Sequence, residues 1–178
     1  MSAGAAKALT SSSHFELFGL PPVFSLDQEM LDKAYRDIQS QVHPDRFAHA
    51  GDAERRASLQ WTTRVNEAYR TLKSPVQRGK HLLELHGVDV AFETNTAMPT
   101  EFLMQQMELR EKLEEAKDAK GLDDLRKNLS SERRALEAQI THAIDSEKNY
   151  KGAADLVRKL MFLERLDEEI DSGYEALE

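Results

Sequence analysis

The stretch Val42-His43-Pro44-Asp45-Arg46 interrupts two amphipathic segments and decides how this chain folds. Pro44 has no amide hydrogen, and its ring disfavours helical backbone at His43, so a helix that arrives at Val42 has to end there. The chain must therefore turn at this point. The stretch predicts a loop between two helical segments.

Apolar residues recur at helical spacing on both sides of this loop. On the upstream side they are Met30, Leu31, Ala34, Tyr35, Ile38 and Val42. On the downstream side they are Ala57, Trp61, Val65, Ala68, Tyr69 and Leu72. Each pattern is typical of a helix with one buried face. Together they predict two antiparallel helices that hold residues 43–45 at their tip.

Two capping signals mark the ends of helices around this hairpin. Ser25 followed by Gln28 resembles a capping box, which predicts the start of the upstream helix. Ser74-Pro75 resembles the N-cap and first residue of a further helix, and Gly87 is a typical stop for it. The sequence thus predicts another helix directly after the hairpin.

The side chains of the loop suit recognition of a protein partner better than catalysis. Asp45 offers a carboxylate to an arginine of a partner, and His43 donates or accepts hydrogen bonds. Pro44 reduces the conformational freedom that the loop loses on docking. Three residues alone also fit a plain turn between structural helices. A general-acid pair of His43 and Asp45 in a small enzyme is a further alternative, but no third catalytic group is identifiable nearby.

The sequence around the loop resembles a J-domain. Residues 14–20, His-Phe-Glu-Leu-Phe-Gly-Leu, resemble its short first helix. Tyr35-Arg36 stands at the expected place on the second helix, and residues 66–69, Asn-Glu-Ala-Tyr, on the third. The resemblance implies that the chain docks on a chaperone of the DnaK type and activates its ATPase. The implied chaperone-binding residues are His43, Pro44, Asp45, Tyr35, Arg36 and Arg46.

One departure from the J-domain pattern concerns charge. J-domains usually carry a basic second helix, whereas Lys33 and Arg36 are accompanied here by several acids. These acids are Asp27, Glu29, Asp32 and Asp37. We therefore expect weaker electrostatic steering toward the chaperone than in a typical J-domain.

Length and charge exclude several classes of protein. The chain has 178 residues, which suits one or two small domains. No apolar run approaches the roughly 18 residues that cross a bilayer, so we expect no association with a membrane. The 24 basic residues are outnumbered by 32 acidic ones, and the net charge of −8 argues against general nucleic-acid binding.

Cysteine and histidine usage limits the chemistry of the chain. The absence of cysteine excludes disulfides and thiol catalysis, and it fits a reducing cytoplasm. The six histidines form no recognisable ligand motif. We therefore expect no metal site and no cofactor in this chain.

A change of pattern after Gly87 predicts a domain boundary. Residues 88–98 show no helical period, and Pro99 ends this stretch. The N-terminal residues lack a helical or apolar pattern as well. We expect a disordered tail over residues 1–12, a J-domain over 13–87, a linker over 88–99 and a C-terminal domain over 100–178.

The C-terminal domain is predicted to be an antiparallel three-helix bundle, which makes the whole fold all-α. Helices are expected at about residues 100–120, 122–148 and 152–171, with Gly121 between the first two. Apolar residues at heptad-like spacing line the last two helices. The predicted core stripe of the first helix consists of Phe102, Leu109, Leu113 and Ala116.

Several large side chains of this domain fall outside the predicted core stripes. Phe162 lies opposite the core stripe of the third helix on a helical wheel. On the first helix the residues set apart in this way are Leu103, Met104, Met107, Glu108 and Glu111. They predict an exposed, partly apolar face for a partner. Packing against the J-domain or a neighbouring helix is the alternative.

Two stretches of this domain are similar to the HscB family, the J-type co-chaperones of bacterial iron–sulfur cluster assembly. They are residues 102–111, FLMQQMELRE, and residues 157–163, VRKLMFL, and residues 83–87 also match. The resemblance implies docking on the chaperone HscA and binding of the scaffold protein IscU. The implied scaffold-binding residues are Leu103, Met104, Met107, Glu108, Glu111 and Phe162.

The function expected from this resemblance is that of a co-chaperone. It stimulates the ATPase of an HscA/DnaK-type chaperone and delivers IscU to it for cluster maturation and transfer. One alternative is a general J-domain protein that delivers a different client through its bundle. A structural helical adaptor with no effect on an ATPase is another. We expect a monomer, with ATP and the cluster bound by its partners.

Overall fold

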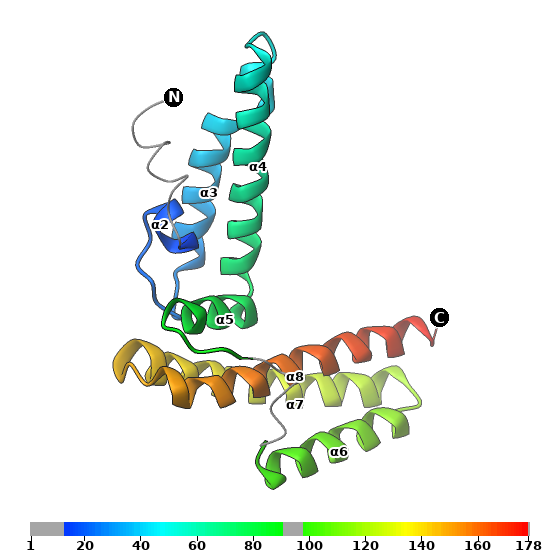
Figure 1. The fold of residues 1–178 in the computed structure, drawn as a ribbon. Helices are drawn as coiled ribbons and strands as arrows, with labels where there is room; N and C mark the ends of the chain where they lie inside the picture. The colour runs from blue at the N-terminus through cyan, green and yellow to red at the C-terminus, as the bar shows by residue number, and fades with distance from the viewer. Residues whose placement is uncertain (1–12, 91–97, 178) are drawn as a thin grey trace. The chain divides into compact units, whose positions relative to one another are not determined.

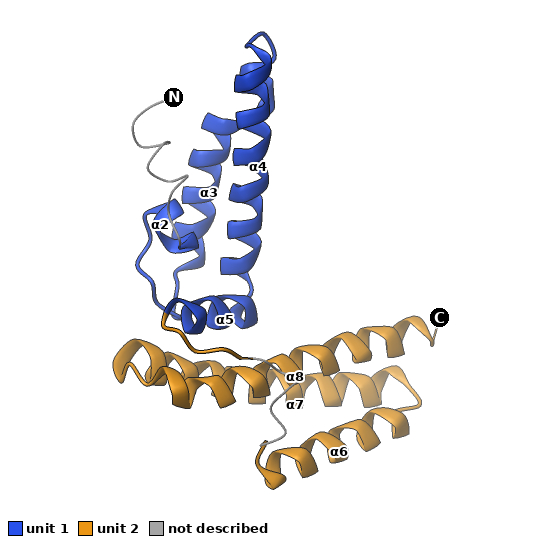
Figure 2. Cartoon of the chain, viewed as in Figure 1, with its two compact units in different colours: residues 1–85 blue, residues 86–178 orange. Residues whose placement is uncertain are grey.

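The computed structural model describes residues 13–90 and 98–177, and every regular element in those ranges is a helix (Figure 1). The all-α prediction is therefore confirmed. The chain divides into two compact units, residues 1–85 and residues 86–178 (Figure 2). The predicted tail and residues 91–97 of the predicted linker lie outside the described residues.

The first unit is built around a helical hairpin. The short helix α2 (His14–Phe18) precedes the two arms of the hairpin, α3 (Gln28–Val42) and α4 (Asp52–Lys73). A 3-10 turn, η1 (Pro44–Phe47), forms the tip between the arms (Figure 1). Helix α5 (Pro75–Leu85) follows α4 directly, and the Ser74 hydroxyl accepts a hydrogen bond from the Gln77 amide as predicted for an N-cap.

The start of α3 differs from the prediction. Its N-cap is Asp27, whose carboxylate accepts hydrogen bonds from the amides of Glu29 and Met30 at 2.9 and 3.3 Å. The capping box expected at Ser25 is therefore wrong, because a carboxylate next to the helix satisfies the free amides and complements the helix dipole.

The core of the first unit lies between the hairpin arms and the two shorter helices. The residues of the predicted apolar faces are buried or half-buried except Met30, which is 52 % exposed, so its assignment to the buried face is wrong. It belongs to the first turn of α3, where the backbone has only just entered the helix. The buried hydrophobic residues of the unit include Phe15, Phe24, Leu31, Trp61, Val65, Leu72, Leu82 and Leu83.

The second unit is a three-helix bundle. Helices α7 (Ala119–Thr141) and α8 (Tyr150–Glu175) run antiparallel and pack against each other, and α6 (Thr100–Glu115) packs against both (Figure 2). Helix α6 ends five residues earlier than predicted. Asp118 caps α7 by accepting the Gly121 amide at 2.8 Å, so Gly121 lies inside the first turn of α7 and not between two helices.

The connection between α7 and α8 also departs from the prediction. A π-helical turn, η2 (His142–Ser146), ends α7 well before residue 148. Lys148 then adopts a positive φ of 55°, and Asn149 caps α8 through the Gly152 amide. Widened turns of this kind redirect a helix without breaking its hydrogen bonding. The apolar heptad pattern continues through this region, which explains why the sequence predicted a longer helix.

Candidate interaction sites

The tip of the hairpin presents the side chains of residues 43–45. The peptide before Pro44 ends α3, and His43 Nδ1 accepts a hydrogen bond from the Asp45 amide at 3.2 Å. One carboxylate oxygen of Asp45 lies 3.5 Å from the same nitrogen, and the Asp45 side chain is 92 % exposed. The imidazole of His43 therefore shapes the turn, while the carboxylate of Asp45 stays available to a partner.

Arg46 has a structural task at this tip. Pro44 has no amide hydrogen to donate to the carbonyl of Ser40, four residues earlier in the helix. The Arg46 guanidinium donates to this carbonyl instead, at 3.0 Å. The predicted chaperone-binding residue Arg46 thus closes the end of α3, and its charge is held close to residues 43–45.

Tyr35 and Arg36, both predicted to contact the chaperone, differ in their surroundings. Tyr35 is half-buried, stacks on Tyr69 at 4.1 Å between ring centroids and donates from its hydroxyl to Asn66 at 2.7 Å. Its ring joins the two arms of the hairpin. Arg36 is exposed on α3. Tyr69 in turn donates to Asp32 at 2.8 Å, which lowers the pKa of that carboxyl.

Helix α6 carries the exposed face that the sequence predicted. The exposed fractions are 44 % for Leu103 and 65 % for both Met104 and Met107. Phe102 and Leu109 are buried in the bundle core, so the separation of core and outer face on this helix is confirmed. Large exposed apolar side chains grouped on one helix are typical of a surface that binds a partner.

Acidic side chains border this α6 face. Glu108 and Glu111 are exposed, and Glu108 accepts a hydrogen bond from Lys112 at 2.7 Å. The hydrogen bond and the charge of Lys112 lower the pKa of the Glu108 carboxyl. The face therefore combines an apolar centre with the exposed side chain of Glu111 and with the Glu108 carboxylate, which stays ionised at neutral pH. We use the term α6 face for Leu103, Met104, Met107, Glu108 and Glu111.

Phe162 is not part of an exposed face, so that expectation is wrong. Its side chain is only 4 % exposed and meets the ring of Phe102 edge to face, with centroids 5.7 Å apart and planes at 85°. The Arg110 guanidinium lies 5.9 Å from the centre of its ring. Phe162 supports α6 from the bundle core, because its ring packs against Phe102, the residue that precedes Leu103 in the sequence.

The helical wheel misplaced Phe162 because α8 does not bury the same side along its whole length. In its first half, Ala153, Val157 and Leu160 are buried. From its middle onward, the bundle core takes up Phe162 together with Leu166 and Ile170. Helix α8 has 26 residues, and α6 covers only part of it (Figure 1). A wheel that averages over the helix assigns one buried face where there are two.

Comparison with known proteins shows the family to which the chain belongs. Residues 98–171 match the family model described as "HSCB C-terminal oligomerisation domain". A curated relative from Burkholderia thailandensis, named co-chaperone protein HscB homolog, is 56 % identical over 169 residues, which cover 93 % of this chain and 96 % of the relative. The chain belongs to the HscB family of co-chaperones. Another HscB homolog, from Azoarcus sp., is 49 % identical over 168 residues and covers 93 % of this chain and 95 % of its own.

Solved HscB structures have the same fold. The chaperone HscB from Vibrio cholerae superposes with a TM-score of 0.81 at 36 % identity, over 93 % of this chain and 99 % of that one. The human co-chaperone protein HscB superposes with a TM-score of 0.88 at 27 % identity, over 93 % of this chain and 83 % of that one. The resemblance stated from the sequence, to J-domain proteins of the HscB family, is confirmed.

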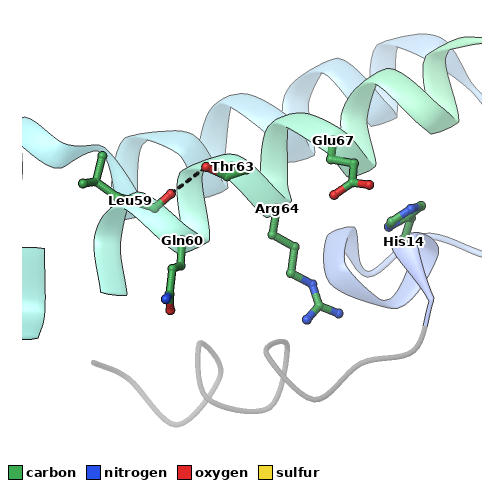
Figure 3. Close-up of a pocket in the computed structure, with 6 residues that line it drawn as sticks. All are labelled: His14, Leu59, Gln60, Thr63, Arg64 and Glu67. Atoms are coloured by element: carbon green, nitrogen blue, oxygen red, sulfur yellow. Dashed lines mark hydrogen bonds between the residues drawn. The ribbon is translucent and has the colours of Figure 1, made fainter. Parts of the chain in front are cut away.

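This HscB-family chain also has a hollow between α2 and α4, of about 570 Å³ (Figure 3). It is lined by His14, Leu59, Gln60, Thr63, Arg64 and Glu67. Burial lowers the pKa of the His14 imidazole. The Thr63 hydroxyl donates to the carbonyl of Leu59 in its own helix, 3.0 Å away. The tip residues His43 and Asp45 do not line this hollow, so it does not enclose them in a catalytic pocket.

The described part of this HscB-family chain shows neither a metal site nor a membrane-spanning helix. Within residues 13–90 and 98–177, no three His, Asp or Glu side chains gather closely enough to hold a metal ion. In the same part of the chain, no helix is both long and apolar enough to cross a membrane. The hairpin tip and the α6 face are therefore the candidate functional sites among the described residues.

Proposed function

We propose that this HscB-family chain stimulates the ATPase of an HscA/DnaK-type chaperone through its hairpin tip and delivers an IscU-type scaffold protein held on the α6 face. Delivery serves the maturation and transfer of the iron–sulfur cluster that the scaffold carries. The observation that carries the proposal is the pairing of two exposed surfaces of different chemistry on two separate units: a polar tip on one and an apolar, acid-bordered face on the other.

The tip suits a partner with a positively charged or hydrogen-bonding surface. Asp45 is almost fully exposed, and a carboxylate forms strong paired hydrogen bonds with an arginine. The turn is already ordered by the His43 imidazole and by Arg46, so docking costs little conformational entropy. A pre-formed tip of this kind acts by favouring the chaperone conformation that hydrolyses ATP.

The α6 face suits a protein surface with an apolar patch and basic neighbours. Leu103, Met104 and Met107 supply apolar area, and methionine adapts its shape to the contact. Glu108 and Glu111 at the edge exclude partners with acidic surfaces and favour basic ones. Phe162 contributes from within, since it holds the α6 backbone in place through Phe102.

A chain with both surfaces raises the concentration of the scaffold near the chaperone. Two modest affinities then act together, because the second contact becomes an intramolecular event. ATP and the cluster remain bound to the partners in this scheme. The lack of cysteine in all 178 residues fits the reducing cytoplasm as the place of action.

We propose that the protein acts as a monomer, although the matched family model is described as an oligomerisation domain. Light scattering across a range of protein concentrations tests this. A stable dimer that Leu103→Glu dissociates would assign the α6 face to self-association.

The experiment that tests the proposed function measures the steady-state ATPase rate of the matching HscA-type chaperone. The protein is added with the scaffold IscU and, separately, with a general peptide client. Strong stimulation that requires IscU supports the specialised function. Stimulation that is indifferent to the client points instead to a J-domain protein whose bundle serves another purpose, and no stimulation at all removes the co-chaperone role.

A further inference from the structure

A buried serine of α4 holds the end of α3 immediately before the tip. The Ser58 hydroxyl donates to the backbone carbonyl of Val42 at 2.6 Å, across 16 positions of the chain. Ser58 is 3 % exposed and Val42 9 % exposed. Buried hydrogen bonds between distant segments are protected from water and keep a fixed geometry.

The Val42 carbonyl needs this donor because α3 stops at the next residue. In a continuing helix it would accept the amide of Arg46, four residues later. That amide instead donates to the carbonyl of His43, at 3.0 Å, within the 3-10 turn. Ser58 therefore replaces a helical hydrogen bond that the turn has removed.

A second hydroxyl, that of Thr62, lies near the same carbonyl but donates its hydrogen to another acceptor. Thr62 Oγ1 is 3.3 Å from the Val42 oxygen and 2.9 Å from the carbonyl oxygen of Ser58. A hydroxyl has only one hydrogen to donate, and the shorter contact takes it. Ser58 is thus the main donor to Val42.

The contact matters because the Val42 carbonyl and the His43 amide belong to one planar peptide group. The His43 amide donates to the carbonyl of Gln39 at 3.0 Å, and the Val42 carbonyl accepts from Ser58. Both polar ends of this peptide plane are therefore fixed. With the plane fixed, the position of the His43 Cα is set, and the hydrogen bond from the Asp45 amide to Nδ1 then orients the imidazole.

We propose that Ser58 is a positioning residue for the tip: it pre-orders residues 43–45 for the chaperone without touching it. The effect on the ATPase rests on the proposed function, whereas the effect on the order of the tip does not. A tip that is ordered before docking binds at lower protein concentration, because less conformational freedom is lost. Once bound, the contacts are the same, so the maximal rate does not depend on Ser58.

The test compares Ser58→Ala with Thr63→Ala in the full-length protein. Both substitutions remove one hydroxyl from α4, but the Thr63 hydroxyl donates only within its own helix. Amide hydrogen exchange and the amide chemical shifts of His43 and Asp45 report the order of the tip. The concentration for half-maximal ATPase stimulation reports docking, and circular dichroism verifies folding.

We expect Ser58→Ala to speed exchange at the His43 amide by about fivefold, as the loss of one hydrogen bond implies. The concentration of Ser58→Ala that gives half-maximal ATPase stimulation should rise by a similar factor, with the maximal rate retained. Thr63→Ala should change neither the exchange rate nor this concentration by more than about twofold. Unchanged exchange and unchanged shifts in Ser58→Ala overturn the inference, whatever the ATPase does.

Failure of the proposed function is distinguishable from failure of this inference. If the unmodified protein does not stimulate the chaperone, the proposed function fails, and hydrogen exchange still decides the role of Ser58. Should Ser58→Ala lose its fold, Ser58→Cys keeps a side chain of similar size with a much weaker donor. Faster exchange at His43 in that variant supports the inference, and exchange equal to that of the unmodified protein rejects it.

Discussion

The imidazole of His81 in α5 accepts a hydrogen bond at Nε2 from the backbone amide of His14, the first residue of α2, at 3.1 Å. The two imidazole rings stack with centroids 4.4 Å apart. Only an unprotonated Nε2 can accept this hydrogen bond. Burial, and secondarily the charge of His14, lower the pKa of His81 to about 4. The contact that joins α2 to α5 therefore depends on a neutral histidine.

Acid should weaken this contact, and the direction follows from the lowered pKa. The unfolded chain binds a proton at His81 near pH 6.5, whereas the folded chain does so only near pH 4. The stability that His81 contributes is therefore complete above about pH 6.5 and is lost progressively between pH 6.5 and 4, by up to about 3 kcal/mol. Urea unfolding at pH 7 and pH 4.5 measures the loss.

Two controls accompany the acid experiment. Other titratable and charged groups face the same site. Burial lowers the pKa of His14 as well, while from α4 the charge of Glu67 raises this pKa and that of Arg64 lowers it. NMR titration of the separate imidazole rings distinguishes them. A His81 titration midpoint near the ordinary value of about 6.5 would contradict the prediction, as would equal stability of the protein at both pH values.

His43→Gln should abolish ATPase stimulation and leave scaffold binding intact. Glutamine can still form hydrogen bonds, but its flexible side chain does not reproduce the rigid imidazole whose Nδ1 accepts the Asp45 amide. The variant should unfold at the same urea concentration as the unmodified protein, because the His43 side chain is 47 % exposed. ATPase assays measure the stimulation, and calorimetry with the scaffold measures the binding. Full stimulation by His43→Gln would show that the tip is not required for activation of the ATPase.

Leu103→Ala combined with Met107→Ala should weaken scaffold binding by about 1 to 4 kcal/mol if the α6 face is the binding surface. Stability should change little, since both side chains are largely exposed. Isothermal titration calorimetry measures the affinity. Leu59→Ala is the matched control, because Leu59 is 56 % exposed on the other unit. Equal affinities for the double variant and this control would show that the α6 face does not bind the scaffold.

Phe162→Ala should act through stability. The side chain is buried against Phe102, so its removal leaves a cavity that costs about 3 to 5 kcal/mol in the free energy of unfolding. Scaffold binding should weaken as a consequence, because α6 loses its support. Urea unfolding and calorimetry are measured on the same sample. A variant with native stability but lost affinity would instead make Phe162 a direct contact.

Much of this architecture was predictable from the sequence because the deciding signals are local. Pro44 cannot continue the helix that precedes it, and the 3.6-residue period of α3 and α4 leaves few choices for their buried faces. On α6, the separation of Phe102 and Leu109 from Met104 and Met107 follows from the same period over a short helix. The hairpin, its tip and the α6 face therefore needed no information from distant residues.

The features that the sequence did not predict depend on contacts between distant segments. Phe162 is buried because α6 covers one part of α8 and not another. The His14 and His81 contact joins residues 67 positions apart, and no spacing rule relates them. Gly121 had the signature of a helix end, but the Asp118 cap three residues earlier starts α7 before it. Local signals compete at such places, and packing decides between them.

The change of buried side along α8 gives this helix two buried regions along its length. Phe162, Leu166 and Ile170 belong to the core that includes α6, while Ala153, Val157 and Leu160 are buried nearer the turn that leads into α8. Regions of a protein can open locally at a lower free energy than the whole. Because α6 packs less extensively on α7 and α8 than these two helices do on each other, we expect α6 to open more readily than the pair. The α6 face would then lie on the part of the bundle that adapts most easily to what it binds.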